Sequence, residues 1–201
     1  MKQEKKLRIL AAGDIHGDTK LARELAEKAK KEKVDLVILT GDIVGMIETE
    51  NIIKPFTDRN EKVVFVPGNW DSPDTAAVLS KLYGIKNLDD YYFAHKNVGV
   101  FGLGSAGVMF LNEKDAFEKL KKNFEKVKNL EKKIMVSHLH AAGTKSELSG
   151  FPGSSGIRKA IEKLQPDLFI SGHIHELEGI EDKVGKTRVI NVGRKGKIIE
   201  I

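Results

Sequence analysis

The chain has 201 residues, 34 lysines and arginines against 29 aspartates and glutamates, and no cysteine. This length suffices for the core of one α/β domain, and we expect residues 1–201 to form a single domain. The lack of cysteine excludes disulfides and cysteine-ligated zinc and is compatible with a cytoplasmic protein. Because no apolar run approaches the roughly 18 residues that cross a bilayer, a membrane partner is not expected.

The net charge of +5 is spread along the chain rather than gathered in one place. Lysines are interleaved with acidic residues in 28–33 and 114–133, a pattern typical of solvated helix faces. A nucleic acid partner is therefore not excluded but is not favoured, since no basic stripe stands alone. The abundance of Lys and Glu also fits a thermophilic protein, and the composition leaves the oligomeric state open.

In the first half of the chain, apolar runs alternate with amphipathic segments. We expect strands at 7–12, 35–40 and 62–66, and helices at 19–32, 47–59 and 73–83. Ser72 and Pro73 mark the start of the third helix, because Ser caps helix N-termini and Pro suits the first turn. The alternation of strands and helices favours a parallel sheet.

In the second half the pattern changes. Segments 91–95 and 98–103 are predicted to form a hairpin through Lys96-Asn97. A helix at 113–130 then returns to a strand at 132–137. A helix at 157–164, a strand at 167–171 and closing strands at 188–192 and 197–201 complete the expected elements.

Five of the apolar runs are followed by a short polar motif. The motifs are Gly13-Asp14-Ile15-His16, Gly41-Asp42, Gly68-Asn69-Trp70-Asp71, Ser137-His138 and Gly172-His173-Ile174-His175. Ligands of open α/β sheets bind at the carboxyl ends of strands, so we expect these side chains to meet at one edge. Residues two apart in an extended segment face the same side. Asp14 with His16, and His173 with His175, are therefore expected to act as pairs.

The candidate ligands combine carboxylate, imidazole and amide groups, and they are Asp14, His16, Asp42, Asn69, His138, His173 and His175. This donor set suits Mn, Ni, Fe, Zn or Co and disfavours Ca. Seven ligands are too many for one tetrahedral ion, and they fit two ions that share a carboxylate. Two ions about 3.5–4 Å apart form a clamp for hydrolysis at phosphorus. The motifs thus predict a dinuclear centre that hydrolyses phosphate esters through metal-activated water.

The order of these motifs resembles the calcineurin-like metallophosphoesterases, from Asp14 to His175. The stretch 137–144, Ser-His-Leu-His-Ala-Ala-Gly-Thr, is similar to the small single-domain archaeal and bacterial branch that includes the Icc-related phosphoesterases. The resemblance implies an α/β fold, a four-layer αββα sandwich with two mixed β-sheets.

The resemblance also implies how the ligands divide between the metals. Asp14, His16 and His175 would hold the first ion. Asn69, His138 and His173 would hold the second, and Asp42 would bridge the two. Asp42 and Asn69 are then also catalytic residues, because Asn69 would orient the phosphoryl oxygens.

Trp70 departs from the family pattern, which has a histidine here that contacts the phosphoryl group and protonates the leaving group. Indole donates a hydrogen bond but no titratable proton, and general acid catalysis typically contributes 10²–10⁴-fold. Either the enzyme favours good leaving groups, or another group serves, for which His140 is the candidate nearest in sequence. Trp70 itself is a candidate substrate contact that stacks on a planar group, or it only packs beside the site.

Two acidic residues and two serines are further candidates. Asp71 is expected to orient a ligand imidazole, that of His138. Asp18 either supports the first metal or caps the following helix. Ser154 and Ser155 precede the expected helix at 157–164, whose N–H groups could hold a phosphate; the alternative is a mobile loop with a serine cap.

The leading interpretation is a phosphodiesterase that acts on a small phosphorylated or nucleotide-like substrate, because small members of the resembled family without that histidine are often phosphodiesterases. A phosphomonoesterase or nucleotidase on the same site is the first alternative. The second is a weakly catalytic protein-interaction module of the same fold. Specificity is expected to depend on loops 43–56, 104–112 and 141–156.

Overall fold

The computed structural model describes residues 6–45, 51–89 and 91–201. The first half of the described chain forms β1 (Arg8–Ala12), α1 (Thr19–Lys31), β2 (Leu36–Leu39), α2 (Lys54–Thr57), β3 (Val63–Phe65), α3 (Pro73–Tyr83), β4 (Lys86–Asn87), β5 (Tyr92–His95) and β6 (Val98–Leu103). The second half forms α4 (Glu113–Glu125), β7 (Lys132–Ser137), the 3₁₀ turn η1 (Lys145–Ser149), α5 (Ser155–Leu164), β8 (Leu168–Ser171), the 3₁₀ turn η2 (His175–Leu177), β9 (Glu181–Val184), β10 (Thr187–Asn191) and β11 (Lys197–Glu200).

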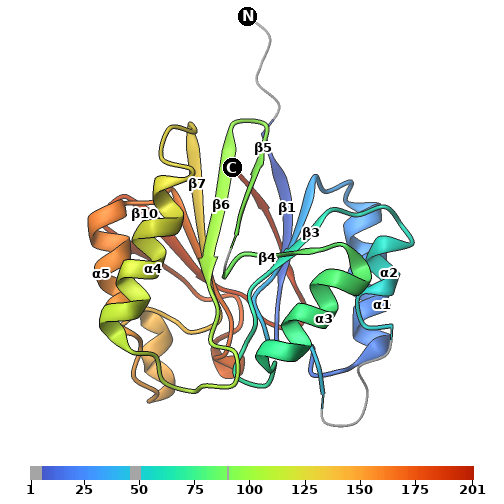
Figure 1. The fold of residues 1–201 in the computed structure, drawn as a ribbon, viewed down its shortest axis with the longest axis horizontal. Helices are drawn as coiled ribbons and strands as arrows, with labels where there is room; N and C mark the ends of the chain where they lie inside the picture. Colours follow the sequence, from blue (N-terminus) through green and yellow to red (C-terminus); the bar gives the residue numbers. More distant parts are fainter. Residues whose placement is uncertain (1–5, 46–50, 90) are drawn as a thin grey trace, which may run out of the picture.

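The strands form two mixed sheets that face each other, with helices on both outer faces (Figure 1). The first sheet has the order β11-β1-β2-β3-β4, with β1, β2, β3 and β4 parallel and β11 antiparallel. The second has the order β5-β6-β7-β8-β10-β9, with antiparallel strands at both edges. Helices α1, α2 and α3 cover the first sheet and α4 and α5 the second, which confirms the four-layer sandwich.

Three apolar cores fill the spaces between these four layers. Alternate residues of a strand face opposite cores: Leu10 packs under α1, whereas Ile9 faces the second sheet. In the same way Ile134 faces the first sheet and Met135 packs under α4 and α5. Both faces of the central strands are therefore buried, which is why they read as continuous apolar runs in the sequence.

Three expected helices differ from the structure at their boundaries. The helix expected at 47–59 is described only as α2, because Pro55 lies in its first turn and would break a longer helix. Residues 47–50 of that expectation lie outside the described residues. Helix α4 ends at Glu125, where tighter hydrogen bonds to the third residue back replace the α pattern at Lys126 and Val127. Helix α5 begins at Ser155 because Ser154 caps it.

Two strands, β4 and β9, were not expected from the sequence. Each lies at the edge of its sheet; β4 has only two residues and β9 is rich in charged residues, so neither gives an apolar run. Among the described residues, no helix is long and apolar enough to cross a membrane.

Candidate metal centre

The candidate ligands lie at the carboxyl ends of strands from both sheets. β1, β2 and β3 of the first sheet precede Asp14, Asp42 and Asn69, and β7 and β8 of the second precede His138 and His173. These ends meet at the lower edge of the molecule in Figure 1. The sequence-based placement of the five motifs after strands is therefore confirmed.

Four candidate ligands have a left-handed backbone: Asp14 (φ 55°), His16 (φ 49°), Asp42 (φ 50°) and His173 (φ 71°). Non-glycine residues adopt this conformation rarely, and strained backbone gathers at functional sites. The predicted extended pairing of Asp14 with His16, and of His173 with His175, is therefore wrong in its geometry. Tight turns, rather than the alternation of a strand, bring the side chains together.

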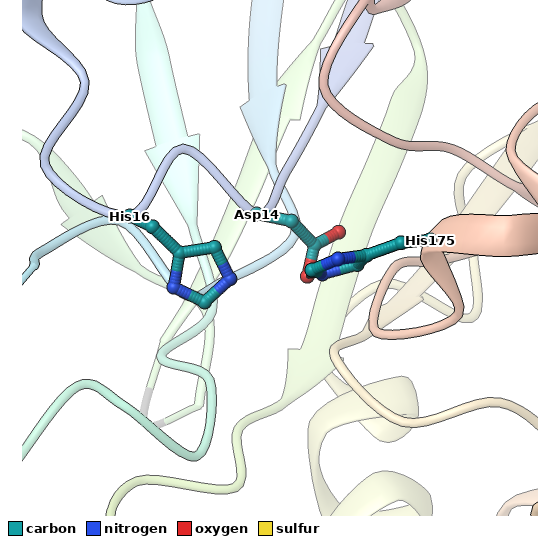
Figure 2. Close-up of side chains that lie close together, drawn as sticks. All are labelled: Asp14, His16 and His175. Atoms are coloured by element: carbon teal, nitrogen blue, oxygen red, sulfur yellow. Dashed lines mark ion pairs between the residues drawn. The ribbon is translucent and has the colours of Figure 1, made fainter.

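The first group of side chains consists of Asp14, His16 and His175, which offer ligand atoms within 4.8 Å of one another (Figure 2). The Nε2 atom of His175 lies 3.3 Å from Oδ1 of Asp14, and this hydrogen bond raises the pKa of His175. The rings of His16 and His175 lie 5.5 Å apart. Burial increases from the half-exposed His175 to Asp14, which is 1 % exposed.

The second group consists of Asp14, Asp42 and His138, all buried. The Oδ2 atom of Asp42 lies 3.5 Å from Nε2 of His138 and 3.7 Å from Nε2 of His16. One carboxylate oxygen thus faces an imidazole from each of the two expected ion sites. This is the position that a bridging ligand requires.

The His138 ring is oriented by the carbonyl of Thr40, which lies 2.8 Å from Nδ1. A carbonyl can only accept, so Nδ1 carries a hydrogen, and in the neutral ring Nε2 is an acceptor. Nε2 faces the amide oxygen of Asn69 at 2.9 Å. With Nδ1 carrying the hydrogen, both Nε2 of His138 and the Asn69 amide oxygen present lone pairs to the same place, which fits a metal ion as their common partner.

His173 lies beside both groups, but its side chain is part of neither. Its backbone N–H donates to both carboxylate oxygens of Asp14 at 3.2 Å, and its ring lies 5.0 Å from that of His138. Burial first, and His138 second, lower the pKa of His173 to about 4. The imidazole is therefore neutral at pH 7, the form in which it can bind a metal.

The glycine of the Asn69 motif is required by the close approach of two loops. A Cβ on Gly68 would lie 2.1 Å from Oδ1 of Asp42. Any larger residue here would push the carboxylate out of the position between the histidines.

Asp71 is fully buried, but it does not act as expected. It accepts hydrogen bonds from the backbone N–H groups of Ile43, Val44 and Gly68, and burial raises its pKa. The carboxylate thus ties the Asp42 loop to the Asn69 loop. The expected role of Asp71 at His138 belongs instead to the Thr40 carbonyl.

Asp18 caps α1 by accepting from the N–H of Leu21 at 2.9 Å, which is the second of the two expected roles. Its other oxygen accepts from Arg194 at 2.8 Å. Arg194 also donates to the carbonyl of Asp14 at 3.1 Å, and so holds the Asp14 loop from the far end of the chain. No motif marks Arg194 in the sequence, which is why we did not expect it.

Trp70 and His140 have different neighbours at the centre. The half-exposed Trp70 ring meets His16 edge-on at 5.4 Å, and its backbone N–H donates to Asp42. His140 is 2 % exposed, and its Nε2–H donates to the carbonyl of Phe151 at 3.2 Å. Burial lowers the pKa of His140, and its Nδ1 has no hydrogen-bond partner in the described chain.

The phosphate cradle expected at Ser154 and Ser155 is not supported. The carboxylate of Glu113 accepts from the Ser154 hydroxyl at 2.6 Å and from the N–H of Gly156. The Ser154 hydroxyl in turn caps α5 through Ile157, and Ser155 is exposed. The N-terminus of α5 is therefore occupied by the protein's own anion.

Solved structures with known folds superpose on nearly the whole chain. The structure of TT1561 from Thermus thermophilus is 17 % identical, with 98 % of this chain and 99 % of that chain covered and a TM-score of 0.75. A dimetal phosphatase from Danio rerio is 13 % identical, with 94 % and 88 % covered and a TM-score of 0.62. An archaeal phosphodiesterase is 18 % identical, with 96 % and 99 % covered and a TM-score of 0.57.

These identities are low enough that the structures establish the fold alone. A search of curated protein sequences gave no significant match. A family model described as calcineurin-like phosphoesterase matches residues 7–177, which contain all five polar motifs. The chain therefore belongs to the calcineurin-like phosphoesterase family.

Proposed function

We propose that this protein is a dinuclear metal-dependent phosphodiesterase. The observation that carries the proposal is the position of Asp42, whose Oδ2 atom lies between the Nε2 atoms of His16 and His138. A structural aspartate would be satisfied by backbone donors, as Asp71 is. Asp42 also accepts one backbone donor, the Trp70 N–H at Oδ1, but its buried Oδ2 atom is directed at two imidazoles, one from each proposed ion site.

The proposed ligand division is the one that the family resemblance implies, and the first group, Asp14, His16 and His175, supports its first half. Asp14, His16 and His175 would hold one ion and Asn69, His138 and His173 the other, with Asp42 shared. Bound divalent ions would polarise the phosphoryl oxygens and lower the pKa of water. The donors suit Mn, Ni, Fe, Zn or Co, and we propose Mn²⁺ for the first trial.

The donors around the site favour a diester over a monoester. A monoester carries close to two negative charges at pH 7, so it needs further cations or N–H groups. At the N-terminus of α5, Glu113 already uses the Ser154 hydroxyl and the Gly156 N–H. Arg194 is engaged by Asp18 and by the Asp14 carbonyl. A diester carries only one negative charge, so it does not need these further cations or N–H groups.

The test compares a diester with a monoester that shares its leaving group. Protein stripped of metal is reloaded with each ion and assayed with bis(p-nitrophenyl) phosphate and p-nitrophenyl phosphate. We expect metal-dependent turnover with the diester hydrolysed faster. Faster hydrolysis of the monoester would assign a phosphomonoesterase or nucleotidase, and no metal-dependent turnover of either would favour the interaction module.

A pair of histidine variants completes this experiment. His16→Ala should abolish diester turnover, because it removes an imidazole that faces Asp42. His95→Ala is the matched control, since His95 lies on β5 outside the five motifs. Equal activity of the two variants would show that hydrolysis does not occur at this site.

A further inference from the structure

A cavity of about 200 Å³ lies beside the candidate metal centre, with His173 and His140 in its wall. The rest of the wall comes from the segments around Phe110 and Phe151. Three large apolar side chains of this wall remain exposed: Phe110 (75 %), Phe151 (53 %) and Met109 (51 %). Exposed apolar groups gathered around one hollow are typical of a site for an apolar ligand.

The cavity borders the candidate metal centre through His173. The Phe151 ring lies 6.3 Å from the ring of His173, which lies 5.0 Å from that of His138. A ligand with its phosphoryl group near His138 can thus extend a neighbouring group past His173 and into the cavity. Trp70 contacts His16 and does not line this cavity.

Side-chain and backbone donors of the wall are already engaged, and Nδ1 of the neutral His140 ring, which has no partner in the described chain, is an acceptor and does not attract an anion. Glu113 accepts from Ser154, and the N–H of Gly153 donates to Glu147. The Nε2–H of His140 donates to the carbonyl of Phe151. These donors are not available to a second phosphate, and the Glu113 carboxylate would repel one. The wall therefore selects for an uncharged, apolar occupant.

We propose that this cavity holds an uncharged aromatic or aliphatic group of the phosphate ester while the phosphoryl group lies at the candidate metal centre. This inference rests on the proposed phosphodiesterase function and adds a substrate class to it. A volume of about 200 Å³ is below the roughly 300–1,000 Å³ of pockets for drug-sized ligands. The occupant is accordingly one ring or a short branched chain, held mainly by Phe151 and Met109.

Binding of two phosphonates tests the proposal without relying on turnover. Phenylphosphonate and methylphosphonate share the phosphoryl group, are not hydrolysed, and differ in the group that would enter the cavity. Calorimetry on the metal-loaded protein, at a pH below the second ionisation of the phosphonates so that each carries one charge as a diester does, should show phenylphosphonate binding about tenfold more tightly, as burial of a ring's additional apolar surface implies. Equal affinities would overturn the proposed cavity and leave the phosphodiesterase proposal standing.

Variants then locate the preference. Phe151→Ala and Met109→Ala should each remove most of the difference between the two ligands by weakening phenylphosphonate binding more than methylphosphonate binding, since both side chains are exposed and their loss does not disturb a core. Leu82→Ala is the matched control, because Leu82 is exposed (68 %) on α3 and does not line the cavity. A preference that survives both wall variants would overturn the assignment. Failure of both phosphonates to bind would overturn this proposal and the proposed function together.

Discussion

The candidate metal centre and the N-terminus of α5 both follow glycine-containing polar motifs, yet only one of them is open to a ligand. At the metal centre, Asp42, His138 and Asn69 direct acceptor atoms at one another. At α5, Ser154 and Gly156 direct their donors at Glu113. The difference is therefore in how donors and acceptors are matched. Acceptor atoms directed at one another fit a cation, whereas the matched donors and acceptors at α5 form a complete structural contact.

The largest expected effect comes from Asp42→Asn. The change removes charge from the carboxylate that faces both ion sites, so we expect a larger loss of diester turnover than for any other ligand variant. The loss should exceed the roughly 10²–10³-fold that follows the removal of one oxyanion-hole donor. Metal analysis and turnover across a ligand-by-ligand series would measure it. A variant that keeps two ions and a near-normal rate would show that Asp42 does not bridge.

His138→Ala and His140→Ala should show that His138 is a metal ligand and that His140 is only a neighbour of the centre. His138 contacts the Asn69 amide and faces Asp42, so its loss should empty the second ion site. His140 belongs to neither ligand group and binds the Phe151 carbonyl, so its loss should retain both ions and change turnover or substrate preference. Metal content per chain decides the matter, and loss of an ion from the His140 variant alone would reverse the assignment.

Glu113→Ala tests the other half of the comparison. The variant leaves the Ser154 hydroxyl and the Gly156 N–H without their anion, so we expect a stability loss of about 1–3 kcal/mol. The exposed helix N-terminus should then accept an external anion. In metal-free protein, sulfate should raise the melting temperature of the variant more than that of the wild type. An equal response to sulfate would indicate that α5 does not use Glu113 as its anion.

Trp70→His tests whether the indole next to His16 only packs or stacks, or acts on binding or folding. Trp70 is half exposed, so histidine can replace it without opening a core. If Trp70 only packs or stacks, the new imidazole should raise turnover of esters with poor leaving groups by up to about tenfold and change nitrophenyl esters less, because protonation helps a basic leaving group most. A uniform change across a leaving-group series would mean that residue 70 acts on binding or folding.

The smallest effect is expected at Glu181, on β9. Its hydrogen bond with Arg188, above all, lowers its pKa from 4.5 to about 2. A lowered pKa in the folded state means that the stabilisation is present above pH 4.5 and is lost as the pH falls through 2. Because the side chain is 38 % exposed, the contribution should stay below about 1 kcal/mol. The stability difference between wild type and Glu181→Gln should shrink between pH 5 and 2 and stay constant above.

The sequence predicted the strand ends well, because strands buried on both faces give continuous apolar runs and each candidate ligand directly follows one. It did not predict how those ligands converge, since the left-handed turns at Asp14 and His173 leave no period in the sequence. It missed Arg194 because the partners of that residue lie more than 170 positions away. It left α5 open between a phosphate cradle and a serine cap, and the structure shows the cap. A Cβ on Gly156 would lie 2.2 Å from the Glu113 carbonyl oxygen, so this glycine serves close packing, which the sequence does not reveal.

The central claim is that Asp42 lies between two metal ions that are both needed for phosphodiester hydrolysis. Its most direct test is a titration of metal-free protein with Mn²⁺ in which bound metal and turnover of bis(p-nitrophenyl) phosphate are followed together. The account predicts two equivalents bound per chain, with turnover appearing as the second site fills. Full turnover with one equivalent bound, or no binding of metal at all, would contradict it.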